Sequence, residues 1–322
     1  MGENTVARAI EKIAAKLGTE AIATSPEIRT CYSFDATNVK TLPAAVVFPR
    51  TTEDVRAIVS ICYEHGVKLI PRGAGTGFAG GSVPLGGEVV LSTERMSRIR
   101  AIDHERRLAI VEAGLVNGVL QREVARYGLM FPPDPSSLEV ATIGGNVAQD
   151  AGGPRALKYG VTRDYVVGIE AVTCNARLIE IGFEVDDRSW VPLRTLLVGS
   201  EGTLAVMTAF ALKLLQLPEA FHTALAFFRT AVSAAEAVSR ILGSGFVPAA
   251  VELMDASTLS CIKKFIDLGI PEASGCSLLI ETDGKASEAL HAMETVRDVL
   301  TSCGAIEVRV ASDAHEREEI WL

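Results

Sequence analysis

A glycine-dense stretch in the first quarter of the chain constrains its fold more than any other feature. Five of the twelve residues from Pro71 to Ser82 are glycine, and they follow the apolar run Val67–Ile70, which reads as a β-strand. Few side chains stand in the way of a ligand in such a loop, and successive backbone N–H groups can form a concave nest for phosphate oxygens. We therefore predict a phosphate-binding loop rather than a flexible linker.

The glycine spacing does not predict a Rossmann fold. Residues 75–80 match the bare Gly-x-Gly-x-x-Gly pattern, but in a Rossmann domain a helix must follow directly. Here Pro84 and the glycines at positions 86 and 87 oppose a helix, and Val89–Ser92 reads as a further strand. A Walker loop is excluded because no Gly-Lys-Ser/Thr follows. The loop therefore belongs to a different phosphate-binding architecture.

Two further glycine-bearing stretches follow. The second covers residues 131–137 and 142–154, and the third covers residues 196–204. Ser, Thr, Asn and Gly have short side chains that let the backbone lie against a flat, polar ligand. Turns of a β-sandwich have a similar composition, but loops of this length are usually functional. We predict that the second stretch is a ligand-binding loop and that the third is a glycine-bearing turn.

Composition excludes several classes of protein. The 322 residues favour two domains. Acidic side chains outnumber basic ones by 40 to 31, which argues against a nucleic acid or an anionic membrane as partner. The six cysteines form no Cys-x-x-Cys pair and the five histidines have no metal-ligand spacing, so we predict no bound metal. Without a signal-peptide pattern or a membrane-spanning apolar run, we expect a cytoplasmic protein.

Five motifs in a fixed order carry a resemblance to a known family. They are PRGAGTG (71–77), PPDPSS (132–137), TIGGNVAQDAGG (142–153), KYGVT (158–162) and VGSEGTL (198–204). Together they resemble the flavoproteins with a vanillyl-alcohol-oxidase (PCMH) type FAD-binding domain. Within that family the chain is most similar to the branch of glycolate oxidase FAD subunits and D-lactate and D-2-hydroxyglutarate dehydrogenases. The resemblance covers roughly residues 25–322.

The resemblance implies an α+β fold in three parts. Residues 1–38 would form an N-terminal helical segment, and residues 39–217 a PCMH-type FAD-binding domain of two α/β subdomains. Pro218 marks a boundary, after which strands and helices alternate. Residues 218–322 would form a partial ferredoxin-like α+β cap domain for substrate.

The cofactor implied is FAD. The family's pyrophosphate loop falls on Arg72, Gly73, Ala74, Gly75, Thr76 and Gly77, with Ser82 close behind. Its contacts to the isoalloxazine and ribityl groups fall on Asp134, Ser137, Thr142, Gly145, Asn146, Gly152 and Gly153. The backbone at Val206 would meet the adenine. Relatives with covalent FAD use a histidine, and none occurs between His65 and His104, so we expect non-covalent binding.

The activity implied is oxidation of a small 2-hydroxy acid, such as glycolate or D-lactate. Bound FAD would accept a hydride, while cations would hold the substrate carboxylate. Arg72 and Lys158 are cations near the flavin loops, but each could equally serve phosphate or the surface. No catalytic residue is assigned. The implied partners are a second flavin-domain subunit and an iron–sulfur subunit.

The sequence departs from its relatives at several places. Asp150 stands where they usually carry asparagine, Ala205 replaces a glycine, and residues 182–195 look shortened. Relatives continue beyond Trp321 into a region with a substrate arginine and a histidine-rich metal motif. A catalytically incompetent FAD-binding module is therefore the alternative to an enzyme. The substrate, the electron acceptor and the oligomeric state stay open.

Overall fold

The computed structural model describes residues 3–182, 193–265 and 269–321. Contacts divide the chain into two compact units. Unit 1 contains the described residues of Met1–Gly152 and Val161–Gln216, and unit 2 those of Gly153–Gly160 and Leu217–Leu322. The predicted domain limits stay a prediction, but two features stand out. Residues 3–38 belong to unit 1, and the short segment 153–160 belongs to unit 2.

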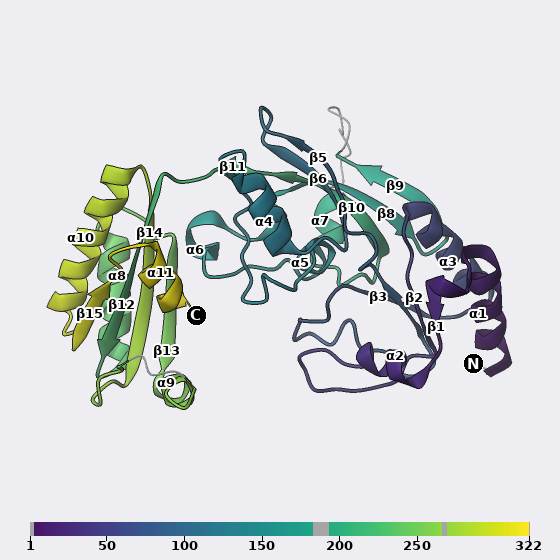
Figure 1. The fold of residues 1–322 in the computed structure, drawn as a ribbon, viewed down its shortest axis with the longest axis horizontal. Helices are drawn as coiled ribbons and strands as arrows, with labels where there is room; N and C mark the ends of the chain where they lie inside the picture. The colour runs from purple at the N-terminus through teal and green to yellow at the C-terminus, as the bar shows by residue number, and fades with distance from the viewer. Residues whose placement is uncertain (1–2, 183–192, 266–268, 322) are drawn as a thin grey trace. The chain divides into compact units, whose positions relative to one another are not determined.

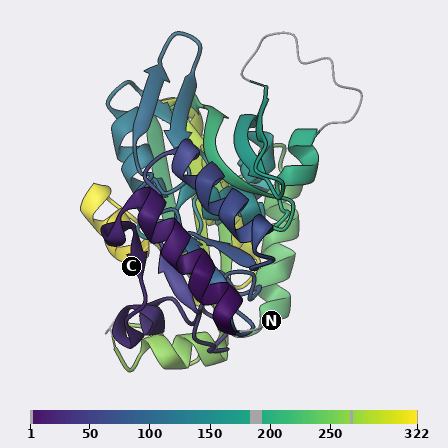
Figure 2. The same ribbon diagram turned by 90° about the vertical axis from the view of Figure 1, so that its right-hand side faces the viewer.

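The first layer of unit 1 is a sheet with two covering helices. Its strand order is β1-β2-β4-β3, and β4 pairs in parallel with both β2 and β3. Helices α1 and α3 lie side by side against it (Figure 2) and share one core cluster with it. Thr51 and Asp54 form a capping box at the start of α3. The bounds are α1 Glu3–Leu17, β1 Ile22–Ala23, β2 Ala45–Val47, α3 Thr52–Glu64, β3 Leu69–Arg72 and β4 Val89–Ser92.

The second layer of unit 1 is an antiparallel sheet of order β5-β6-β10-β8-β9 (Figure 1). Its core contains Phe131, Phe210 and Ile143, all fully buried. Buried Glu112 and Glu170 are both paired with Arg100. The bounds are β5 Ile99–Asp103, β6 Leu108–Glu112, α4 Asn117–Ala125, α5 Ile143–Gln149, β8 Val166–Thr173, β9 Leu178–Ile181, α7 Leu193–Leu197 and β10 Ala205–Lys213.

Unit 2 is a four-stranded antiparallel sheet of order β13-β14-β12-β15. Apart from the short helix α9 between β13 and β14 and the last helix α11, the chain order is strand, helix, strand, strand, helix, strand, which is that of a ferredoxin-like fold. Side chains alternate along the strands, so Ala224, Ala226 and Leu278 pack in one core with α8 and α10, while Leu225 and Leu279 pack with Trp321 of α11. The bounds are β12 Ala220–Phe228, α8 Ala231–Gly243, β13 Ala250–Asp255, α9 Ala256–Ile262, β14 Cys276–Gly284, α10 Ala286–Ser302, β15 Glu307–Val310 and α11 Ala314–Trp321.

Short elements complete the two units. Strands β7 and β11 form a two-stranded sheet of their own. The bounds are η1 Thr19–Ala21, α2 Pro26–Cys31, β7 Leu129–Met130, α6 Ala156–Tyr159, η2 Thr162–Asp164 and β11 Leu215–Gln216.

One predicted loop is wrong in part. Residues 142–154 were expected to be irregular, but residues 143–149 form the helix α5. The Thr142 side chain caps it by accepting a hydrogen bond from the Gly145 N–H at 3.2 Å, and this cap offsets the low helix propensity of two glycines. After the first glycine loop the chain runs through turns into β4 and forms no helix, as Pro84 predicted. The shortened region 182–195 falls largely outside the described residues.

Candidate functional site

The first glycine loop is delivered by β3 and turns sharply over Arg72. Gly75 has φ +73°, a conformation that favours glycine. A Cβ atom at Gly75 would lie 2.1 Å from Arg72 Nη2, so the guanidinium fills the space directly beneath the turn. The loop therefore makes a turn that a glycine permits, with a buried cation against its backbone.

The second glycine stretch packs against the first. A Cβ atom at Gly73 would lie 2.3 Å from Thr142 Oγ1, so the Thr142 side chain lies against the backbone of the first loop where only a glycine leaves room for it. Thr142 is the residue that caps α5. The same helix carries Asn146 and Gln149 along its length.

The third glycine stretch contacts both α5 and the first loop. The N–H of Gly199 donates to the Val147 carbonyl and that of Glu201 to the Ala148 carbonyl, each at 2.9 Å. A Cβ atom at Gly81 would lie 2.6 Å from Glu201 Oε2, so this side chain reaches the first loop. All three glycine stretches thus meet in unit 1.

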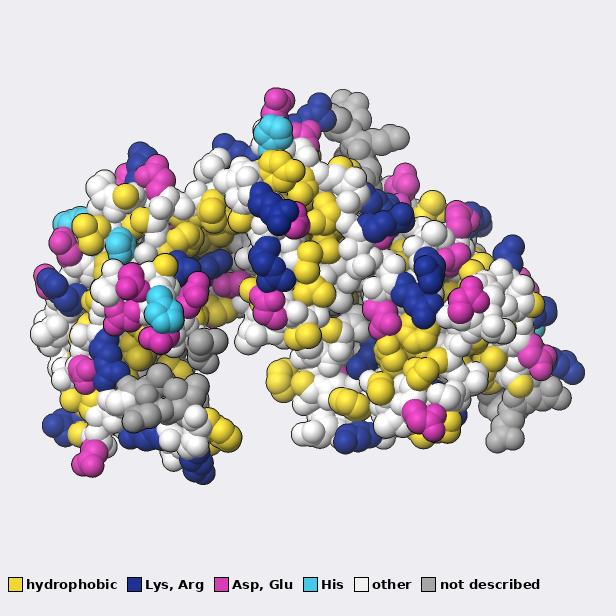
Figure 3. Space-filling model, viewed as in Figure 1, with side chains coloured by type: hydrophobic (Ala, Val, Ile, Leu, Met, Phe, Trp, Pro, Cys, Tyr) yellow, Lys and Arg dark blue, Asp and Glu magenta, His cyan; other side chains and the backbone are white. Residues whose placement is uncertain are grey.

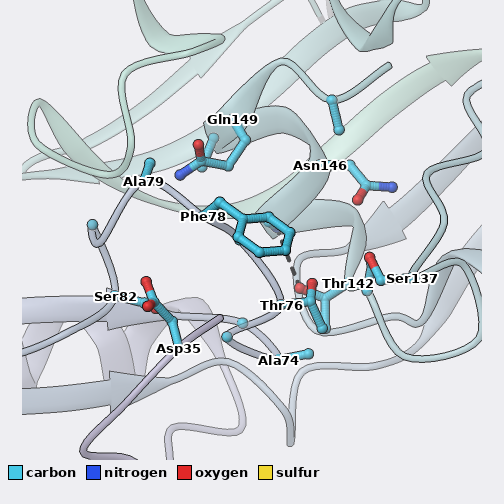
Figure 4. Close-up of a pocket in the computed structure, with 18 of the residues that line it drawn as sticks. Asp35, Ala74, Thr76, Phe78, Ala79, Ser82, Ser137, Thr142, Asn146 and Gln149 are labelled. Carbon is cyan, nitrogen blue, oxygen red and sulfur yellow. Dashed lines mark hydrogen bonds between the residues drawn. The ribbon is translucent and has the colours of Figure 1, made fainter. Parts of the chain in front are cut away.

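A cavity of about 320 Å³ remains between the loops (Figure 4). Its lining comes from the first loop, the start and end of α5, and a few residues elsewhere in unit 1. The predicted residues that line it are Gly73, Ala74, Gly75, Thr76, Gly77, Ser82, Ser137, Thr142, Gly145 and Asn146. Small ligands typically bind in cavities of about 300–1,000 Å³. The loops are therefore not packed shut.

Asn146 provides a test of whether the cavity fits a polar ligand. The residue is only 3% exposed, and its Nδ2 atom has no hydrogen-bond partner among the described residues. A buried donor without a partner costs about 1–3 kcal/mol, so native structures rarely leave one unexplained. The amide lies at the lining of the cavity, where a ligand oxygen or nitrogen can accept a hydrogen bond from Nδ2. The residues present thus fit a polar cofactor.

The charge beneath the first loop is only partly compensated within the protein. Arg72 is 6% exposed, and its Nη1 reaches the Ser82 carbonyl and hydroxyl oxygens only at 3.4 Å. Burial lowers the pKa of the Arg72 guanidinium, while the charge of Asp35 acts to raise it. The guanidinium also lies over the Tyr32 ring at 5.7 Å. An anion above the loop would supply the compensation that these contacts leave incomplete.

The other predicted cofactor residues lie outside this cavity. Arg72 lines a neighbouring cavity of about 50 Å³ together with Gly73 and Gly145. Val206 lines a separate cavity of about 200 Å³, formed by α3, β3 and the third loop. Asp134 and Gly152 do not line the main cavity, and Gly153 belongs to unit 2.

Several lining residues were not predicted, including four with a charged, amide or aromatic side chain. Asp35, Phe78, Gln149 and Glu201 all contribute to the cavity. Glu201 and Gln149 lie inside two of the five motifs, so the motifs contained a signal for them. Phe78 lies within the first loop, directly after the motif PRGAGTG. Asp35 comes from a distant segment, which a 3.2 Å hydrogen bond from the Ala36 N–H to the Gly77 carbonyl joins to the first loop.

Two charged residues highlighted by the sequence are engaged in ion pairs. Lys158 pairs with the fully buried side chain of Asp283, within unit 2. Asp150 ends α5 in the left-handed conformation, and its carboxylate accepts hydrogen bonds from the backbone and side chain of Arg163. Asparagine suits the same backbone conformation, so the replacement by Asp150 adds a charge that Arg163 neutralises.

The surface has no large field of one sign on the face shown in Figure 3, where acidic and basic side chains lie next to one another. Within the described residues, no helix is long and apolar enough to cross a membrane.

These loops and layers, with the α+β unit of the same chain, are typical of a class of protein that binds a phosphate-bearing cofactor. Comparison with family models identifies the class. An FAD binding domain matches residues 43–182, and an FAD linked oxidase C-terminal domain matches residues 217–322. The chain belongs to this family of FAD-linked oxidases, and FAD as the cofactor is confirmed.

Several curated relatives are similar over most of the chain. It is 40% identical over 290 residues to the glycolate oxidase subunit GlcD of Bacillus subtilis, covering 89% of this chain and 62% of the relative. It is 36% identical to the Escherichia coli K12 subunit of the same name, covering 94% and 61%. It is 35% identical to a D-lactate dehydrogenase of Archaeoglobus fulgidus, covering 90% and 65%. The chain thus spans about three fifths of the length of these relatives.

Solved structures confirm the predicted fold class. Alkyldihydroxyacetonephosphate synthase matches with a TM-score of 0.82 at 21% identity, covering 97% of this chain and 62% of that one. p-Cresol methylhydroxylase matches with a TM-score of 0.76 at 19% identity, covering 97% and 66%. At these identities the similarity concerns the fold alone.

Proposed function

We propose that this chain takes part in the FAD-dependent oxidation of a small 2-hydroxy acid, glycolate or D-lactate, to the 2-oxo acid. The observation that carries the proposal is the cavity between the three glycine stretches, lined by Asn146, whose Nδ2 has no hydrogen-bond partner in the described part of the chain. Similarity to glycolate oxidase subunits and D-lactate dehydrogenases supports the substrate class.

Each predicted residue has a proposed place in binding FAD. The backbone of residues 73–77, with Ser82, would bind the diphosphate, and Arg72 would balance its charge from beneath the loop. The side-chain amide of Asn146 would donate to a polar atom of the cofactor, beside Ser137, Thr142 and Gly145. Asp134, Gly152 and Gly153 would flank this region, and the cavity at Val206 would take the adenine. We propose that no covalent bond to the protein forms.

Bound FAD supplies the acceptor for a hydride from the substrate's α-carbon. The residues described here bind and orient the cofactor for that step. The first loop and α5 contact each other at Gly73 and Thr142, so their relative position is set before the cofactor binds. Such preorganisation lowers the ordering cost of binding.

Anaerobic reduction tests the proposed oxidation. Purified protein is mixed with glycolate or with D-lactate under anaerobic conditions, and the visible absorbance of bound flavin is followed. The proposal expects bleaching by at least one of the two acids, and none by L-lactate. Persistent flavin absorbance with both acids, in protein that carries FAD, would contradict it.

The second candidate is an FAD-binding module without turnover of its own. This second candidate is favoured because both cations suggested for the substrate carboxylate already have another place. Arg72 lies beneath the first loop, and Lys158 pairs with buried Asp283. Unbleached flavin in the same experiment is the result that this candidate expects.

We also propose that the chain works together with partner subunits. Two of its relatives are named as subunits of a glycolate oxidase. A second flavin-domain subunit and an iron–sulfur subunit are the partners proposed, the latter to carry electrons away. Co-purification of the tagged chain from its source, followed by iron analysis of the complex, tests this.

Replacement of Asn146 tests the cofactor site separately from turnover. Because Nδ2 has no hydrogen-bond partner in residues 3–182, 193–265 and 269–321, Asn146→Leu should leave the free energy of unfolding of the apoprotein unchanged or raised. It should weaken FAD binding about tenfold, equivalent to about 1.4 kcal/mol. Asn117→Leu is the matched control, since Asn117 Nδ2 donates to the Pro133 carbonyl at 3.0 Å. The control should lose stability by about 1–3 kcal/mol. Titration with FAD and urea denaturation measure the two effects, and unchanged FAD affinity in Asn146→Leu would remove Asn146 from the site.

A further inference from the structure

A short segment joins the proposed FAD pocket to unit 2. Residues Gly153–Gly160 belong to unit 2 by their contacts, although the chain on either side belongs to unit 1. We call this segment the strap. The residues just before and just after the strap are hydrogen-bonded to each other within unit 1. The N–H and the hydroxyl of Thr162 both donate to the Ala151 carbonyl, at 3.0 Å and 2.6 Å. Ala151 itself lines the 320 Å³ cavity.

The strap is held on one face of the unit 2 sheet. In the antiparallel pair of β12 and β14, Phe221 is opposite Asp283 and Thr223 is opposite Glu281. Because side chains alternate, these odd-numbered residues lie on the face away from α8 and α10. Two carboxylates two residues apart on β14 therefore share a face, and the strap supplies cations to both.

The first anchor is Asp283. Its side chain is fully buried, yet it is paired with Lys158 Nζ and accepts a hydrogen bond from the Tyr159 hydroxyl. A buried carboxylate is costly unless a cation and hydrogen bonds compensate it. Both of these partners come from the strap, so the strap must stay in place for the buried Asp283 side chain to keep them.

The second anchor is Glu281, at the other end of the strap. Its side chain is also fully buried, with Arg155 Nη2 at 3.6 Å from Oε1. The Arg155 guanidinium also lies over the Phe221 ring, 5.6 Å from its centroid. Thr223 and Trp321 donate to Oε2 of the same carboxylate, at 3.0 Å and 3.1 Å. The strap is therefore fastened at both ends, to neighbouring positions of a central strand.

We propose that Asp283 is a positioning residue for FAD binding and acts through the strap. This inference rests on the proposed FAD pocket and goes beyond it. Gln149 and Ala151 line the pocket immediately before the strap begins, and Asn146 lies one helical turn earlier. A strap held on β14 restricts the backbone freedom of this end of α5 before FAD arrives. The backbone then loses less conformational entropy when FAD binds, so binding is tighter.

Asp283→Asn is the variant that tests the proposal. It removes the charge while keeping the side-chain shape, and it leaves behind Lys158, which is 29% exposed and can be solvated. Lys158→Met is a poorer choice, because it would leave the buried carboxylate unpaired. Tyr159→Phe is the milder second variant and removes only the hydroxyl. Asp298→Asn is the matched control, since Asp298 is a surface residue paired with the adjacent Arg297.

The measurements are the FAD dissociation constant, by titration of the apoprotein, and amide hydrogen exchange by mass spectrometry. Asp283→Asn should weaken FAD binding about fivefold, at the lower end of typical coupling between sites. Exchange in the strap and in α5 should become faster in the apoprotein, and exchange in α10 should stay unchanged. Tyr159→Phe should change the same quantities in the same direction, but less. Asp298→Asn should change none of them.

An FAD affinity within twofold of wild type, together with faster exchange in the strap, would overturn the proposal. Unchanged exchange in the strap would overturn it as well, since Asp283 would then not hold the strap. If Asp283→Asn also accelerates exchange in α10, unit 2 has opened, and Tyr159→Phe decides by the same two criteria. Failure of the wild-type protein to bind FAD would refute the proposed pocket instead, so the two failures are distinguishable.

Discussion

Replacement of Gly75 by valine is the sharpest test of the first glycine loop. Gly75 has φ +73°, and a non-glycine residue in the left-handed region costs about 1–2 kcal/mol, more when it is β-branched. A Cβ atom there would lie 2.1 Å from Arg72 Nη2, so the guanidinium must move from beneath the loop. The substitution therefore combines backbone strain with displacement of a buried cation.

The expected loss of FAD affinity follows from that displacement. A hydrogen bond to a charged group contributes about 1.5–3 kcal/mol, and the valine methyl groups would also occupy the lining of the cavity. Together these effects predict binding at least about 100-fold weaker, equivalent to about 2.8 kcal/mol. We expect Gly75→Val to be isolated as colourless apoprotein with its secondary structure largely kept.

Gly87→Val is the control for backbone strain alone. Gly87 has φ +84°, no atom lies within 4 Å of a Cβ built there, and the residue does not line the 320 Å³ cavity. This variant should lose about 1–2 kcal/mol of stability and keep its flavin. Visible absorbance of the purified proteins, far-UV circular dichroism and urea denaturation give the readouts. Normal flavin content in Gly75→Val, or equal loss in both variants, would refute the assigned role of the loop.

Two further predictions concern the rest of unit 1. Burial acts to raise the pKa of Glu112 and of Glu170, but hydrogen bonds from Arg98 and Arg100 respectively outweigh it and hold both pKa values below the usual 4.5. Their stabilisation should be complete above about pH 5 and decline as the pH falls through the lowered values, and acid unfolding curves that stay flat there would contradict this. Burial raises the pKa of Cys62 to about 12, so iodoacetamide at pH 8 should alkylate exposed Cys174 and leave Cys62 until denaturation; peptide mass spectrometry that finds equal rates would disprove it.

Local rules predicted much of unit 1 because neighbouring residues decide those features. Pro84 and the two following glycines exclude a helix after the first loop whatever the rest of the chain does. The strand Val89–Ser92 was predicted with the bounds that β4 has. The helix α5 was missed because its two glycines have low helix propensity, and the cap from Thr142 outweighs them.

Other features depend on residues that are far apart in the sequence. No local pattern reveals that Asp35 reaches the first loop through the Ala36–Gly77 hydrogen bond. Lys158 reads as a free cation in the sequence, because its partner Asp283 is 125 residues away. The pair is important for the structure because a buried carboxylate is costly unless a cation compensates it, and no local sequence preference reports this.

The sequence alone thus specified the glycine stretches, their order and the cofactor that they imply, since backbone freedom at a glycine is a local property. The tertiary structure decided how the three stretches close around one cavity, and among the residues that it describes it left Asn146 Nδ2 at the lining without a hydrogen-bond partner. It also assigned the strap to unit 2. These outcomes arise from close packing and from the compensation of buried charge, which involve groups that meet only once the chain has folded.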